Sequence, residues 1–300
     1  MFIVKYKKIF LALSVILMIV SIVFIFTFGL KLGIDFKGGA LLELDFVGDR
    51  PEADSVQNSL NSLGINQALI QPTGGDGYLG YLIKTRDLTE EEHQKILAFW
   101  SKAGKYNATE KSYTSIGPSV GSELARKAIL SMIFVIIAII LFITYAFRKV
   151  SKPVPSWKYG IITIITLLHD IIIPTGIFAL VSHYTGAEVD TLFVLALLTI
   201  LGLSVHDKIV VFDRIRENLR DEEQKDFAET VGKSTKETIV RSINITLTII
   251  GVLVPLYFFG PETTKNFAFI LTIGLFFGIY SSLFFASPML VWIKEWQDRK

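Results

Sequence analysis

The sequence predicts a polytopic α-helical membrane protein with six transmembrane helices and one small α+β domain between the first two. Hydrophobic residues make up 51% of the 300-residue chain, and the mean hydropathy is +0.50. Six apolar runs approach or exceed the roughly 20 residues with which a helix crosses about 30 Å of hydrocarbon. Between the first two runs lies a long segment in which strand and helix patterns alternate.

The six runs are the predicted membrane spans. They cover residues 9–28, 128–147, 159–181, 191–212, 238–259 and 267–293. The first follows a group of lysines, as a signal peptide does, but it is too long for a typical hydrophobic region of such a peptide. No small-residue cleavage site follows it, so we expect this run to remain as an anchor.

Basic residues concentrate in alternate connections between the runs, which predicts the orientation of the chain. The members of this set are Lys5, Lys7, Lys8, Arg148, Lys149, Lys152, Lys158, Arg214, Arg216, Arg220, Lys225, Lys233, Lys236, Lys294, Arg299 and Lys300. By the positive-inside rule, both termini are cytoplasmic. The predicted parts are the N-terminus and first span (1–28), an extracytoplasmic domain (29–127), a five-span bundle (128–293) with cytoplasmic loops (148–158 and 213–237) and a cytoplasmic tail (294–300).

Charge and cysteine content exclude some classes of function. The net charge of +2 adds little to a basic pattern that topology already explains, so we expect no nucleic acid partner. The chain has no cysteine, which excludes disulfides and thiolate metal sites.

Segment 29–127 has the pattern of a ferredoxin-like domain. Its predicted strands cover 40–46, 67–71, 78–85 and 108–116, its helices cover 51–63 and 89–102, and a turn lies at 74–77. The order β-α-β-β-α-β is the split βαβ arrangement. Thr89 and Glu92 fit a capping box, whereas His93 and His183 are expected to be solvated. Without clustered His, Asp or Ser, the domain is interpreted as a docking or substrate-contacting unit.

Asp207 lies within the fourth apolar run, where a carboxylate is costly to bury and is by default a functional-site hypothesis. It is about five residues from the end of that run, and Arg241 is about four residues into the next. At about 1.5 Å per residue, both side chains would lie roughly 5 to 8 Å below the inner boundary. We therefore expect them to meet at one depth.

Further polar residues lie on the same helix faces as these two charges, so that each helix has a polar stripe. Ser204 shares a helix face with Asp207, and Asn244 and Thr248 follow Arg241 at helical spacing, so the two stripes are predicted to line a polar path. A nearby arginine favours the charged carboxylate and desolvation favours the neutral acid. A movement that separates Asp207 from Arg241 would then change the proton affinity of the carboxylate. The alternative is a static buried pair that fixes helix packing.

His169 and Asp170 lie near the middle of the third run and leave two interpretations open. They form either a second proton relay or a structural contact between bundle helices. A metal site is disfavoured because adjacent helical residues point about 100° apart, and no cofactor is expected. A ridge of small residues in the sixth run is interpreted as a helix-packing surface: Gly274, Gly278 and Ser282.

Five sequence motifs in order carry a family resemblance across essentially the whole chain. They are LGIDFKGG (32–39), SIGPSVGSEL (115–124), LLHD (167–170), LGLSVHDKIVVFDRIREN (201–218) and RSINITLT (241–248). Together they resemble the SecD/SecF family of the bacterial Sec export machinery, which belongs to the resistance-nodulation-division superfamily of proton-driven transporters.

The resemblance implies a multi-pass, non-hydrolytic subunit of the bacterial inner membrane that pairs with SecD. It would use the proton or ion motive force to draw preproteins through the SecYEG channel, with membrane lipid and a YajC-like small protein as further partners. Asp207 would be the coupling carboxylate and Arg241 the arginine of the next span, with His206 beside them. At the two positions beside Asp207, the family more commonly has Asn and Thr, where this chain has His206 and Lys208. Lys208 would either alter the proton affinity of Asp207 or snorkel to the interface.

Two other functions fit the composition. One is a half-transporter of the same superfamily that exports a lipid or small solute, which is disfavoured because such relatives usually carry both halves on one chain. The other is a scaffold that stabilises the channel complex without coupling to an ion.

Overall fold

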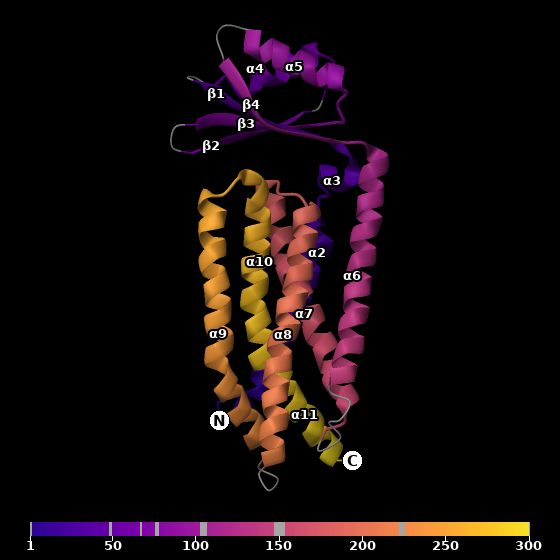
Figure 1. Ribbon diagram of the computed structural model, residues 1–300, viewed down its shortest axis with the longest axis vertical. Coiled ribbons are helices and arrows are strands. Elements are labelled where there is room, and N and C mark those ends of the chain that lie inside the picture. Colours follow the sequence, from indigo (N-terminus) through magenta and orange to yellow (C-terminus); the bar gives the residue numbers. More distant parts are fainter. Residues whose placement is uncertain are drawn as a thin grey trace. The chain divides into compact units, whose positions relative to one another are not determined.

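Figure 1 shows the computed structural model, which describes residues 2–47, 50–66, 68–75, 78–102, 107–146, 154–221 and 226–299. Two compact units are present, one formed by Met1–Lys31 with Leu130–Lys300 and the other by Leu32–Ile129. Within the described residues, six helices are long and apolar enough to cross a membrane. The predicted fold class is therefore confirmed.

The membrane spans are longer than the apolar runs that predicted them. They are α2 (Lys7–Phe28), α6 (Pro118–Ala146), α7 (Ser156–Thr185), α8 (Thr191–Asp221), α9 (Phe227–Phe259) and α10 (Glu262–Tyr280), and the last continues through η1 (Ser281–Ala286) into α11 (Ser287–Asp298). A short helix, α1 (Phe2–Lys5), precedes them. Most of the predicted loop 213–237 is thus helical, because its Arg, Glu and Lys residues are good helix formers. The predicted loop 148–158 lies largely outside the described residues.

Three spans form the centre of the helical unit. Half or more of the most apolar window is buried in α7, in α8 and in the final α10–α11 span, against 6% in α6 and 17% in α9. Helix α10 packs against α7, α8 and α9, and α2 packs mainly against α7. Figure 1 shows both chain ends at the same end of this bundle. The apolar sides of α6 and α9 consequently remain available to lipid or to another chain.

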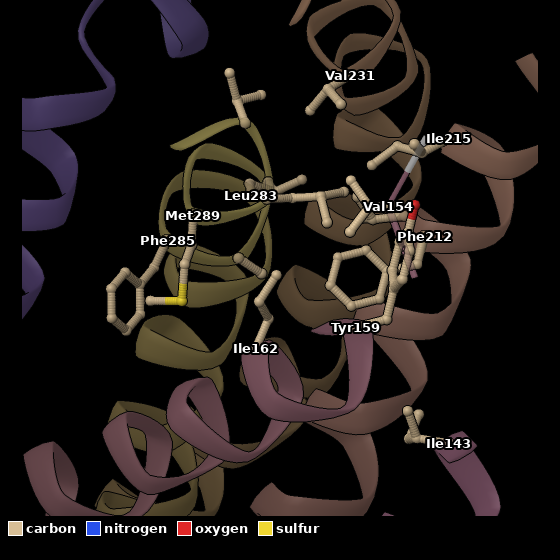
Figure 2. Packing of buried hydrophobic residues seen from close by; sticks show 14 of the residues in the cluster. Ile143, Val154, Tyr159, Ile162, Phe212, Ile215, Val231, Leu283, Phe285 and Met289 are labelled. Atoms are coloured by element: carbon tan, nitrogen blue, oxygen red, sulfur yellow. The ribbon is translucent and has the colours of Figure 1, made fainter. Parts of the chain in front are cut away.

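The main hydrophobic cluster ties the central helices together (Figure 2). The ring of Tyr159 on α7 meets that of Phe212 on α8 edge-on, with centroids 5.2 Å apart. Phe285 of η1 and Met289 of α11 belong to the same cluster. Because these aromatic and sulfur-containing side chains interlock across three spans, the cluster holds the bundle centre in one arrangement.

A π-helical segment, η1, interrupts the last span, where a single regular helix was expected. The hydroxyl of Ser287 donates to the carbonyl of Ser282, five residues earlier, at 3.4 Å. Pro288 follows directly, and in a regular helix its ring would clash with the carbonyl four residues before it. The widened turn accommodates the proline, and π-segments of this kind recur at functional sites.

The other unit has the predicted β-α-β-β-α-β order. It contains α3 (Ile34–Lys37), β1 (Gly39–Val47), α4 (Ala53–Ser62), β2 (Leu69–Gly75), β3 (Tyr78–Thr85), α5 (Glu90–Lys102) and β4 (Asn107–Ile116). All neighbouring strands are antiparallel, and the sheet order β2-β3-β1-β4 is that of the split βαβ arrangement. Part of the predicted turn, residues 76 and 77, lies outside the described residues.

The capping box at the start of α5 is present. The backbone N–H of Thr89 donates to Glu92 Oε2 at 3.0 Å, and the N–H of Glu92 donates to Thr89 Oγ1 at 3.3 Å. The expectation for His93 is wrong, because this side chain is 6% exposed. It lies on the inner face of α5 with Ile96 and Trp100, at the helical spacing that could have revealed it.

A close backbone crossing joins the two ends of this unit. Gly38 has φ +81°, and a Cβ placed there would lie 2.8 Å from the Cα of Pro118. Gly39 has φ +140°, and a Cβ there would lie 2.7 Å from the carbonyl oxygen of Thr85. A Cβ on Gly121 would in turn lie 2.8 Å from the backbone nitrogen of Gly38. Only glycine combines this backbone conformation with so close an approach.

Candidate functional site

A group of polar side chains is buried where α7, α8 and η1 meet. We call this group the buried charge cluster, and it consists of His169 and Asp170 of α7, Ser204 and Lys208 of α8 and Ser281 of η1. Lys208 and Asp170 are both 0% exposed. Charges buried this deeply are tolerated only when they are paired and hydrogen-bonded.

Every hydrogen of the Lys208 ammonium group has an acceptor. Lys208 Nζ donates to Asp170 Oδ2 at 2.6 Å and to Ser281 Oγ at 3.2 Å, and it also donates to Ser204 Oγ. An ammonium has three donors, so this set is complete. The alternative in which Lys208 snorkels to the interface is wrong, because its side chain is buried in the bundle and bonds to Asp170.

Asp170 is the acceptor at the centre of the cluster. Its Oδ2 receives hydrogen bonds from Lys208 and from the hydroxyl of Ser204, and its Oδ1 lies 3.0 Å from His169 Nδ1. An ionised carboxylate only accepts, so His169 carries its proton on Nδ1. The other ring nitrogen, Nε2, is buried and has no hydrogen-bond partner within the described residues. Its surroundings are the rings of Phe277, Tyr280 and Phe285.

Asp207 is next to Lys208 in the sequence but has a different environment. It is 8% exposed, and within residues 154–221 and 226–299 its carboxylate forms no hydrogen bond or ion pair. The charged groups that act on it electrostatically are Lys208, His206, Arg241 and Asp170. It is therefore a buried carboxylate close to charges and without a direct partner among the described residues.

The structure does not bring Asp207 and Arg241 into an ion pair. Arg241 lies on the exposed side of α9, whereas Asp207 is on a buried side of α8. His206 is also exposed. Two residues at the same depth meet only if they also lie on the sides of their helices that face each other. The sequence predicted the depth of Asp207 and Arg241 but not the side that each one faces.

The predicted polar stripes also face different neighbours. Asn244 and Thr248 are exposed on the same side of α9 as Arg241, and Thr248 Oγ1 donates to the Asn244 carbonyl at 2.8 Å. Ser204 belongs to the buried charge cluster and is directed to Asp170 on α7. In this chain alone, the two stripes do not line one path between α8 and α9.

The small residues of the last span let it approach α8 closely. A Cβ added to Gly274 would collide with Ile200, and one added to Gly278 would lie 3.6 Å from Ser204 Oγ. Ser282 is buried and donates to the Gly278 carbonyl at 2.9 Å. This approach brings η1 close enough for Ser281 to reach Lys208.

The charged sequence after Phe212 forms a contact between α8 and α9. Arg214 Nε donates to Glu237 Oε2 at 2.6 Å, and Asn218 Nδ2 donates to Ser234 Oγ at 2.9 Å. Asp213 and Arg216, by contrast, pair with each other on the same helix. This charged segment is thus partly a contact that joins the two helices.

Sequence reasoning did not find the partnership of Lys208 with Asp170. The two residues are 38 positions apart, and the adjacent Asp207 suggested a different role for the lysine. The spacing of Ser204 and Lys208, one helical turn, was the available signal that both face one neighbour.

Comparison with known families yields two matches. The family model of the protein export membrane proteins SecD and SecF, C-terminal region, matches residues 96–296. The model of the SecD/SecF GG motif matches residues 23–48, a range that includes the closely packed Gly38 and Gly39.

Similar proteins support the same assignment. The protein translocase subunit SecF of Thermobaculum terrenum is 39% identical, with 99% of this chain and 94% of the relative covered. That of Anaerolinea thermophila is 36% identical, with 97% and 94% covered. The crystal structure of SecDF, a translocon-associated membrane protein from Thermus thermophilus, matches 97% of this chain with a TM-score of 0.81 and 28% identity. This chain spans 38% of the length of that SecDF chain.

Proposed function

Because the chain belongs to the SecD/SecF family of protein export membrane proteins, we propose that it couples an ion gradient to the movement of preproteins across the bacterial cytoplasmic membrane. It acts as an accessory subunit of the Sec translocase, drawing preproteins outward through the SecYEG channel and releasing them. We take protons as the coupling ion because a carboxylate such as that of Asp207 can bind and release one.

The observation that carries this proposal is the environment of Asp207. A carboxylate in a membrane span is costly, and this one is 8% exposed with charged residues around it. It forms no hydrogen bond or ion pair within the described part of the chain. Such a group can gain and lose a proton without first breaking a hydrogen-bonded pair, which an ion-coupling residue requires.

A second six-helix half completes the site. Helix α9 exposes Arg241, Asn244 and Thr248 on one side of an otherwise apolar span, and such polar groups need partners in a membrane. The relatives solved as SecDF support SecD as the chain that supplies them. A YajC-like small protein and lipid are further neighbours of the complex.

The basic residues and the position of the chain ends support a cytoplasmic location for both termini. Both termini lie at the same end of the bundle (Figure 1), and the lysines and arginines near them favour the cytoplasmic side. Unit Leu32–Ile129 is then extracytoplasmic, where it contacts the emerging preprotein.

Substitution Asp207→Asn tests the proposal. We expect the variant to insert and to associate with SecD, but to lose preprotein release driven by the proton motive force. Asp213→Asn is the matched control, since it makes the same change on the same helix at an exposed carboxylate. Unaltered release by Asp207→Asn would contradict ion coupling and favour the scaffold function.

A further inference from the structure

The two carboxylates near the centre of α7 and α8 have unequal surroundings. Asp170 accepts hydrogen bonds from a lysine, a serine and a histidine. Asp207 has no direct partner within the described residues. We propose that Lys208 is a positioning residue that holds Asp170 as a permanent anion and thereby leaves Asp207 as the only carboxylate of this region that exchanges protons. This inference rests on the proposed function and assigns a role to a residue outside the coupling pair.

In the Lys208–Asp170 pair, the charged atoms of both side chains are buried and hydrogen-bonded. The ammonium and the carboxylate are both 0% exposed, and their atoms are 2.6 Å apart. All three ammonium hydrogens are used, and both carboxylate oxygens accept. Protonating Asp170 would remove the anion and leave an uncompensated ammonium in a fully buried site, which is strongly unfavourable.

The direction of the Lys208 side chain determines which carboxylate it neutralises. Adjacent residues on a helix project about 100° apart, so Asp207 and Lys208 face different sides of α8. The lysine charge is consequently matched by Asp170 rather than by its neighbour. Asp207 has no direct ion-pair partner within the described residues, and the charges that act on it from a distance are Lys208, His206, Arg241 and Asp170.

The elements around Asp170 contribute the following polar and titratable groups. Helix α7 contributes His169, and η1 contributes the Ser281 hydroxyl. Helix α10 contributes Tyr280, whose ring stacks on His169 and whose hydroxyl faces Ser14 of α2. Helix α8 contributes the cation and the nearby Asp207. Lys208 is the cation that bonds directly to Asp170 within the described residues.

Infrared difference spectroscopy between acidic and neutral pH detects a protonated carboxyl group by its carbonyl stretch. It needs no chemical probe to reach the buried group. In the unaltered chain in lipid vesicles, we expect a buried-acid band that disappears in Asp207→Asn. Lys208→Met should add a second such band, because Asp170 then loses its counter-charge. Lys208→Arg, which keeps the charge while altering the packing, should not add it.

A double variant, Asp170→Asn with Lys208→Met, removes both charges of the pair and is the form expected to fold most readily. It should retain the Asp207 band and lack the second. The inference is overturned if Lys208→Met adds no band, or if the unaltered chain already shows an Asp170 band that the double variant lacks. Absence of the Asp207 band would instead contradict the proposed function, so the two failures are distinguishable.

Discussion

Consecutive residues of α8 have different surroundings because their side chains point in different directions. Lys208 completes a hydrogen-bonded pair with Asp170, whereas Asp207 is left beside charges without bonding to them within the described residues. The direct partner of Lys208 is therefore Asp170 on α7 and not its neighbour in the sequence. Residue type alone could not reveal this, since the relevant partner lies on another helix.

Glycine at position 38 is a second case in which one residue determines local structure, and Gly64 provides a matched control. Both have positive φ, +81° and +78°, but only a Cβ on Gly38 would meet other atoms within 4 Å. Gly64→Ala should therefore cost about 1–2 kcal/mol of conformational strain. Gly38→Ala should cost a further 1–3 kcal/mol or so from overpacking against Pro118. Thermal unfolding of the full chain in detergent measures both, and equal effects would contradict the close crossing.

At the level of helices and strands, the sequence predicted element type well and element ends less well. Strand β3 has the predicted bounds, and the α5 capping box forms as expected. Helices α8 and α9 extend beyond the apolar runs, because hydropathy detects where a helix crosses lipid and not where it ends. Contacts such as Asn218–Ser234 extend the helical pair into the polar region.

Long-range partnerships were the part of the candidate site that the sequence could not supply. Asp207, Arg241 and His169 were all recognisable as costly groups in apolar runs. Which side of each helix they face depends on packing. The π-segment that brings Ser281 to Lys208 likewise depends on how the last span fits against α8.

The start of α5 provides a pH-dependent prediction. Its hydrogen bond with Arg86, assisted by the N–H of Thr89, lowers the pKa of Glu92 from 4.5 to about 2. A lowered folded-state pKa stabilises the fold above the unfolded-state value, and that stabilisation is lost as pH falls toward the folded-state value. The unfolding temperature of Glu92→Gln should thus differ most from that of the unaltered chain above about pH 4.5, and the difference should shrink toward about pH 2.

Glu91→Gln is the control for this measurement, because it removes the same charge one residue away without changing the capping box. If the difference between Glu92→Gln and the unaltered chain were constant from about pH 7 to about pH 3, the Arg86–Glu92 pair would not contribute to stability.

At the scale of the whole molecule, the chain has the features of one half of a larger assembly. Three spans bury half or more of their most apolar windows, but α6 and α9 bury little, and α9 exposes polar residues within an apolar span. The apolar sides of α6 and α9 can contact lipid at no cost, but the exposed polar residues of α9 need partners in a membrane, which a partner half can supply. The coupling site is accordingly expected to be complete only in the complex.

Proton flux into sealed vesicles that contain this chain paired with SecD is the decisive measurement. With an imposed proton gradient and an engaged preprotein, we expect flux that depends on Asp207 and is lost in Asp207→Asn, while Asp213→Asn retains it. Flux that is absent from the unaltered complex, or equal in the Asp207→Asn complex, would contradict an ion-coupled role for this chain.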